Sequence, residues 1–145
     1  MAGVKLTGDW KKFESMIGKT ITKMRHSQTL TEAIGETLVA STRERFENEE
    51  RPDGTKWDKS IRAQNEGGQT LTDKAIMKNS IGYEASPKMV AVGTAEVYGA
   101  IHQFGGKAGR GKKVTIPERA FLGLSEDDKD EIRGVVEDFM AEGLV

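Results

Sequence analysis

The sequence predicts an α+β fold in which helices pack on a small antiparallel β-sheet. Two segments carry apolar residues at helical spacing, one from about residue 29 to 50 and one from residue 125 toward the C-terminus. Between them, residues 80–84 and 89–93 have strand character and are separated by the turn signal Ser86-Pro87. We therefore expect a β-hairpin covered by helices, a long C-terminal helix and extended loops.

Length and composition favour one domain, residues 1–145, with a modest core. The hydrophobic fraction is 36%, and 22 basic and 23 acidic side chains leave a net charge of -1. The whole molecule is therefore not a nucleic-acid-binding protein of the strongly basic kind, and any basic surface must be local. The absence of cysteine excludes disulfides, zinc–thiolate sites and thiol nucleophiles, and it fits a reducing compartment.

The sequence shows no targeting or membrane-spanning segment. Its first ten residues, MAGVKLTGDW, are too polar for a signal peptide. No run approaches the roughly 18 apolar residues that cross a bilayer. We expect a soluble protein made in the cytoplasm, with no membrane partner.

The N-terminal third is expected to hold a short strand at Val4–Thr7 and two helices. Asp9 can cap the first helix, which ends before Gly18. The second begins near Thr29 and runs to about Glu50, which makes it the longest helix. The two apolar stripes are Trp10, Phe13 and Ile17, and Leu30, Ile34, Leu38 and Phe46.

A turn at Pro52-Asp53-Gly54 must end the long helix, because proline fixes φ and glycine supplies positive φ. We expect Trp57 to be an ordered anchor, in the core or at an interface, and the polar residues after it to form a loose loop as far as Gln69. A short helix from about Thr72 to Asn79 then leads into the β-hairpin.

After the hairpin, apolar residues at helical spacing surround His102, and Val114–Ile116 is expected to return to the sheet. Ser125 can cap the C-terminal helix, whose first turn carries acidic side chains that suit the helix dipole. Its apolar stripe is Ile132, Val135, Val136, Phe139 and Met140.

The stretch GGKAGRGKK, residues 105–113, resembles part of a phosphate-binding loop. Gly106 to Lys112 supply the first seven positions of G-x-x-x-x-G-K-[ST], but Lys113 stands where a hydroxyl must bind magnesium. The stretch also precedes a short strand ending at Pro117, whereas a phosphate-binding loop opens a helix. We predict a mobile, basic, glycine-rich loop and no nucleotide site.

No pattern predicts a catalytic, cofactor or metal site. The two histidines, His26 and His102, lack the spacing of metal ligands. His102 is expected to pack against a bend and donate to a backbone carbonyl, a structural role favoured over catalysis because no nucleophile or orienting acid has a fixed spacing to it. The acidic residues 126–131 lack the spacing of a calcium loop, so we attribute them to the helix dipole.

Several short sequence motifs, in their order along the chain, resemble those of a phage protein family. The set resembles the virion morphogenesis, or tail-completion, proteins of Mu-like and related contractile-tailed bacteriophages over roughly residues 40 to 135. The motifs are Arg45-Phe46, Arg51-Pro52-Asp53-Gly54-Thr55-Lys56-Trp57, Leu71-Thr72-Asp73, Ser80-Ile81, Val92-Gly93-Thr94, Tyr98, Ile101-His102-Gln103-Phe104-Gly105-Gly106 and the run from Ile116 to Ser125 that includes Arg119.

This resemblance implies a structural protein without enzymatic activity or cofactors, located in the tail or neck of the virion. Such a protein completes or terminates the tail and joins it to the head, working as a ring. The usual sixfold symmetry of tails favours a hexamer, by analogy. The implied partners are other copies of the chain and the tail tube, sheath or head-connector proteins.

A ring needs a projection and a socket on each subunit, and two loops are candidate projections. One holds Trp57; the other is residues 105–113, whose cations can touch phosphates of packaged DNA, clamp an acidic neighbouring subunit, or form a solvated tip. The segment 117–124 can pack in the core or at an interface. The interface or DNA-contact candidates are Trp57, Lys107, Arg110, Lys112, Lys113, Arg119, Phe121 and Leu122. The alternative function is a small nucleic-acid-binding module that uses the basic loop.

Overall fold

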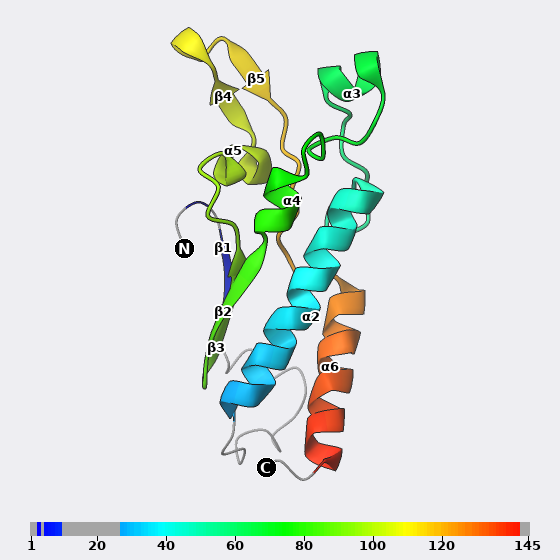
Figure 1. The fold of residues 1–145 in the computed structure, drawn as a ribbon, viewed down its shortest axis with the longest axis vertical. Helices are drawn as coiled ribbons and strands as arrows, with labels where there is room; N and C mark the ends of the chain where they lie inside the picture. Colours follow the sequence, from blue (N-terminus) through cyan, green and yellow to red (C-terminus); the bar gives the residue numbers. More distant parts are fainter. Residues whose placement is uncertain (1–2, 4, 10–26, 143–145) are drawn as a thin grey trace.

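The computed structural model describes residues 3, 5–9 and 27–142, so the helix expected at Trp10–Ile17 lies outside the described residues. Figure 1 shows an elongated molecule with helices α2 and α6 side by side and the strands β1, β2 and β3 on the other side of α2. The elements are β1 (Lys5–Asp9), α2 (Ser27–Asn48), α3 (Ile61–Glu66), α4 (Ile76–Ser80), β2 (Gly82–Ser86), β3 (Met89–Gly93), α5 (Gly99–Phe104), β4 (Gly106–Ala108), the 3-10 helix η2 (Arg110–Lys112), β5 (Val114–Ile116) and α6 (Glu126–Ala141). The predicted α+β class is confirmed.

The main sheet is antiparallel with strand order β1-β3-β2. Strands β2 and β3 form the predicted hairpin, with Ser86 opposite Met89 across a two-residue turn. The central strand β3 buries Val90 and Val92 in the core, and Ala91, which points to the opposite face of the sheet, is buried as well. Strand β1 lies near the strand predicted at Val4–Thr7 and includes Asp9, the residue expected to cap a helix.

Helix α2 is the centre of the domain because it packs on β2 and β3 on one side and on α6 on the other (Figure 1). Its predicted apolar residues Leu30, Ile34, Leu38 and Phe46 are all buried. Gly35 lets the helix approach the sheet closely, since a Cβ atom there would lie 2.5 Å from Cδ2 of Tyr83. A glycine inside this helix is therefore required by packing.

Helix α6 begins where the sequence predicts. Ser125 accepts a hydrogen bond from the backbone N–H of Asp128, and the Asp128 carboxylate accepts one from the backbone N–H of Ser125. This capping box satisfies two N–H groups that the helix leaves unpaired. Ile132, Val136 and Phe139 are buried against the rest of the core, which confirms the predicted stripe.

Two short helices differ from the sequence-based expectation. The segment after Trp57 was expected to be a loose loop as far as Gln69, but Ser60 accepts from the N–H of Ala63 and starts helix α3. Helix α4 begins four residues later than the predicted Thr72, because Leu71 and Ala75 have φ of 63° and 54°. Left-handed backbone cannot continue a right-handed helix, so the first turn is displaced.

The prediction that Val114–Ile116 returns to the main sheet is wrong. Strand β5 pairs with β4 to form a separate two-stranded sheet, with Gly106 opposite Ile116 and Ala108 opposite Val114. The side chains of Val114 and Thr115 are exposed, and Ile116 is half-buried. A strand of three residues without a buried face would bury little apolar surface by joining the main sheet. It therefore pairs with the neighbouring strand β4.

Candidate functional site

Residues 106–116 form a basic arm, which consists of β4, η2 and β5. Figure 1 shows the arm beyond helix α5, at the opposite end of the molecule from the last turn of α6. Its four cations, Lys107, Arg110, Lys112 and Lys113, are all exposed. None forms an ion pair with an acidic side chain of the described residues. The arm is therefore a concentrated positive surface that the subunit itself does not neutralise.

The base of the arm is tightly constrained. Helix α5 ends at Phe104 and is capped by Gly105, whose N–H donates to the carbonyl of Ile101 at 2.8 Å and whose φ is 72°. A Cβ atom at Gly105 would lie 2.8 Å from the backbone nitrogen of Glu118, so only glycine fits where the two ends of the arm meet. The N–H of Arg119 donates to the carbonyl of His102 at 2.7 Å and closes the base.

The chain that leaves the arm, residues 118–122, has no regular secondary structure, and we call it the clamped segment. Because its backbone groups lack strand or helix partners, side chains from distant parts of the chain satisfy them. Gln103 does so twice, with Oε1 accepting from the N–H groups of Phe121 and Leu122 at 3.1 and 3.0 Å. The donors to its carbonyls are Arg51 to Glu118 at 2.9 Å, Trp57 Nε1 to Ala120 at 2.8 Å, Arg45 to Phe121 at 2.9 Å and Gln103 to Leu122 at 3.1 Å.

A buried ion pair joins the clamped segment to both long helices. Arg45 on α2 pairs with Asp128 on α6, and their side chains are 5% and 2% exposed. Arg45 also donates to the carbonyl of Phe121, and Ser41 donates to Asp128. The two charges are thus fully partnered in a site from which water is excluded, as a buried pair requires. The path of the chain from the arm to α6 is fixed by these contacts.

The structure separates the predicted contact residues into two groups. Trp57, Arg119, Phe121 and Leu122 are buried in the subunit. The segment 117–124 is in the core only in part, because Glu118 is exposed and Gly123 and Leu124 are half-buried. Trp57 is only 5% exposed, so within the subunit its side chain is an anchor of the core. Arg119 donates to the carbonyl of Asp58 at 2.7 Å, and burial lowers its pKa. The cations of the arm are the exposed group.

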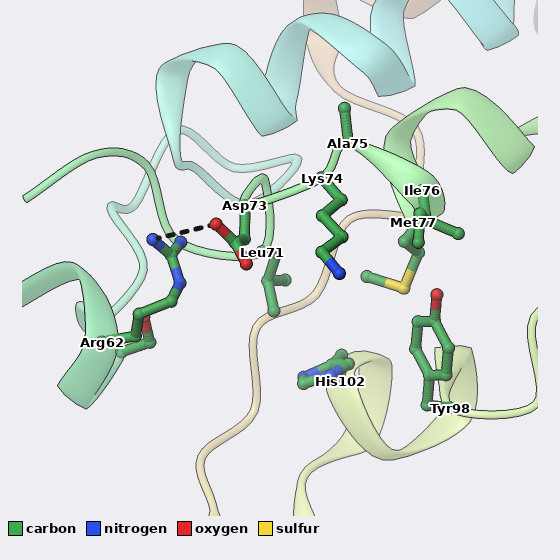
Figure 2. A pocket seen from close by; sticks show the side chains of 10 residues that line it. Arg62, Leu71, Asp73, Lys74, Ala75, Ile76, Met77, Tyr98 and His102 are labelled. Carbon is green, nitrogen blue, oxygen red and sulfur yellow. Dashed lines mark ion pairs between the residues drawn. The ribbon is translucent and has the colours of Figure 1, made fainter. Parts of the chain in front are cut away.

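His102 lies beside a pocket of about 340 Å³ between α3, α4 and α5. Figure 2 shows Lys74, Met77, Tyr98 and His102 around this space, with the Arg62–Asp73 ion pair farther away. Burial, and then the charge of Arg119, lower the pKa of His102, which favours its neutral form. Its Nδ1 atom is buried and has no hydrogen-bond partner among the described residues, so it does not make the predicted bond to a carbonyl.

The described residues hold no group of three His, Cys, Asp or Glu side chains placed to bind a metal ion. No helix in the described ranges is long and apolar enough to cross a bilayer. What stands out instead is an exposed cationic arm on a rigid support.

Comparison with known proteins decides the family. The sequence model of the phage virion morphogenesis family matches residues 8–141. The chain belongs to this family. A Haemophilus influenzae protein called Mu-like prophage FluMu G protein 2 is 40% identical over 114 residues, which are 79% of this chain and 78% of that protein. No solved structure matches the chain.

Membership of the phage virion morphogenesis family identifies a virion-associated protein with a role in phage structure or assembly. Several sequence motifs that carry the family resemblance contain the residues that hold the base of the arm in place. Arg45, Arg51, Trp57 and Gln103 each donate to the clamped segment, which itself lies in the last motif. Sequence reasoning missed that these residues act together. No local sequence signal pointed to Gln103.

Proposed function

We propose that the chain is a ring-forming subunit that completes or terminates the phage tail and joins it to the head, without enzymatic activity. The observation that carries this proposal is the basic arm, which leaves the body with four unpaired cations while its base is held by Gly105 and the clamped segment. A surface that is charged, exposed and rigidly supported is suited to contact with another macromolecule.

A ring requires heterologous contacts that close on themselves, with different surfaces of each subunit meeting at every interface. The arm is the projecting surface of such a contact. By analogy with the sixfold symmetry of tails, we propose a hexamer that sits on the tail tube, the sheath or the head connector. Location in the tail or neck of the virion follows from this role.

The second candidate is a small nucleic-acid-binding module. The same four cations favour it, because exposed lysine and arginine side chains bind phosphates without reading sequence. In this case duplex DNA would bind the isolated protein, and affinity would fall steeply as salt concentration rises. The net charge of -1 on the whole chain favours the ring.

Light scattering of the purified protein across a concentration series, with and without short duplex DNA, separates the two candidates. We expect a closed oligomer of about six 15.9 kDa subunits whose mass DNA does not change. A mass that increases only when DNA is added would support the nucleic-acid-binding module. A mass that keeps growing with concentration, without DNA and without a plateau, would indicate open filaments and contradict a closed ring.

A further inference from the structure

A second charged surface lies outside the arm, on residues of α2, α6 and the loops next to them. A hollow of about 610 Å³, which we call the acidic groove, opens between the C-terminal half of α2, the turn 50–54 and the start of α6. Six acidic side chains line it, against two basic ones. They are Glu50, Asp53, Glu126, Asp127, Asp128 and Glu131, with Arg45 and Arg51 as the basic pair.

The basic residues of the groove are already occupied within the subunit. Arg45 pairs with Asp128 in the floor, and Arg51 donates to the carbonyl of Glu118 while its charge also acts on Asp53. Two of the acidic residues are paired as well, Glu50 with Lys56 and Glu126 with Lys129. Asp53, Asp127 and Glu131 are exposed, and the described part of the chain offers none of them an ion-pair partner. The groove is therefore negative toward an approaching surface.

The groove has a fixed shape. Gly123 and Pro52 meet in its wall so closely that a Cβ atom at Gly123 would lie 2.6 Å from Cγ of Pro52. Asp53 is held by the turn, where its carboxylate accepts from the N–H of Thr55 at 2.8 Å, and hydrogen bonds with Thr55 lower its pKa. A groove with packed walls and positioned charges can receive a partner with little reorganisation.

The arm of a subunit does not cover its own groove. In Figure 1 the arm stands beyond α5 at one end of the molecule, whereas α6 lies beside α2 and extends toward the other end. The arm strands pack against each other, η2 and α5, and they have no extensive contact with α2 or α6. Both charged surfaces are therefore free at once, on different sides, as a head-to-tail contact between copies requires.

We propose that the basic arm of one copy docks in the acidic groove of the next copy. This inference rests on the proposed ring and names the two surfaces that form its repeated contact. Charge complementarity favours a second copy over DNA, because each arm then meets the Asp127 and Glu131 carboxylates, which have no ion-pair partner among the described residues, whereas DNA phosphates leave the groove uncovered. The positive arm of one subunit would then be matched by the negative groove of its neighbour, which fits a chain whose net charge is close to zero.

Cysteine cross-linking tests this contact directly, because the chain contains no cysteine of its own. Lys113→Cys in the arm and Asp127→Cys at the groove are prepared as separate variants, mixed in equal amounts and mildly oxidised. We expect a covalent heterodimer on non-reducing gels, with a yield on the order of tenfold above a control mixture, because docking raises the effective concentration of the paired thiols. The control mixture pairs Asp127→Cys with Lys88→Cys, an exposed position in the β2–β3 turn.

The yield should fall as salt concentration rises, because exposed charges are screened. Equal yields in the test and control mixtures would overturn the proposed contact, as would a preferred Lys113→Cys homodimer, which requires arms that meet each other. A heterodimer whose yield does not respond to salt would also contradict a charge-driven contact. A closed ring by light scattering without this heterodimer would preserve the proposed function while overturning the contact between arm and groove.

Discussion

Replacing Asp128 with alanine is expected to lower the free energy of unfolding by about 3–5 kcal/mol, because it leaves a buried arginine without its partner. Arg45 is 5% exposed and pairs with Asp128, so its charge would remain in a site closed to water. The same substitution removes the carboxylate that accepts from the N–H of Ser125 and so breaks the capping box of α6. Urea denaturation followed by circular dichroism measures the loss.

Asp130→Ala is the matched control, two residues along the same helix. The Asp130 side chain is 72% exposed and forms an ion pair with Arg133 at 3.0 Å, so its loss should cost less than about 1 kcal/mol. The double variant Arg45→Met/Asp128→Leu should recover much of the lost stability, since apolar replacements leave no unpaired charge. Equal, small effects of Asp128→Ala and Asp130→Ala would contradict the role of the buried pair.

Phe46→Ala should lower the free energy of unfolding by about 3–5 kcal/mol through the cavity it creates. Phe46 is fully buried where α2 meets the clamped segment. Its ring centroid lies 5.4 Å from that of Trp57, with the planes at 81°, and 5.3 Å from that of Phe121. Edge-to-face and tilted contacts add to the burial of apolar area. Urea denaturation again gives the magnitude.

Phe104→Ala provides the control, since the Phe104 side chain is 68% exposed at the end of α5. A surface change of this kind should alter the free energy of unfolding by no more than about 0.5 kcal/mol. If both phenylalanine variants lost similar stability, the cluster around Phe46 would not be the centre of the core. A decrease in the free energy of unfolding below about 1 kcal/mol for Phe46→Ala would likewise contradict the central place of Phe46 in the core.

Local signals in the sequence were sufficient for the elements with one buried face. The apolar spacing of α2 and α6, the cap at Ser125 and the turn between β2 and β3 all act within a few residues, and the structure has each of them. The sequence-based predictions failed where local signals were weak or absent. Helix α3 depends on a single cap at Ser60, and β5 follows β4 because it has no buried face of its own.

The support of the arm could not be predicted because it is made of long-range contacts. The Nε1 atom of Trp57 reaches the carbonyl of Ala120 across 63 positions, and Arg45 reaches Phe121 across 76. Likewise, the cations of the arm were evident from their clustering in the sequence, but the acidic groove combines residues 41–54 with residues 123–131. Only the packing of α6 against α2 brings those two stretches together.

Electron microscopy of particles tests most directly whether the chain has a structural role in completing the tail. Particles should be collected after induction of a prophage from which the gene for this chain has been deleted, with the intact gene supplied on a plasmid as the control. We predict that heads and tails accumulate separately in the deletion lysate and join again when the gene is supplied. Normal numbers of complete, infectious virions in the deletion lysate would contradict the claim.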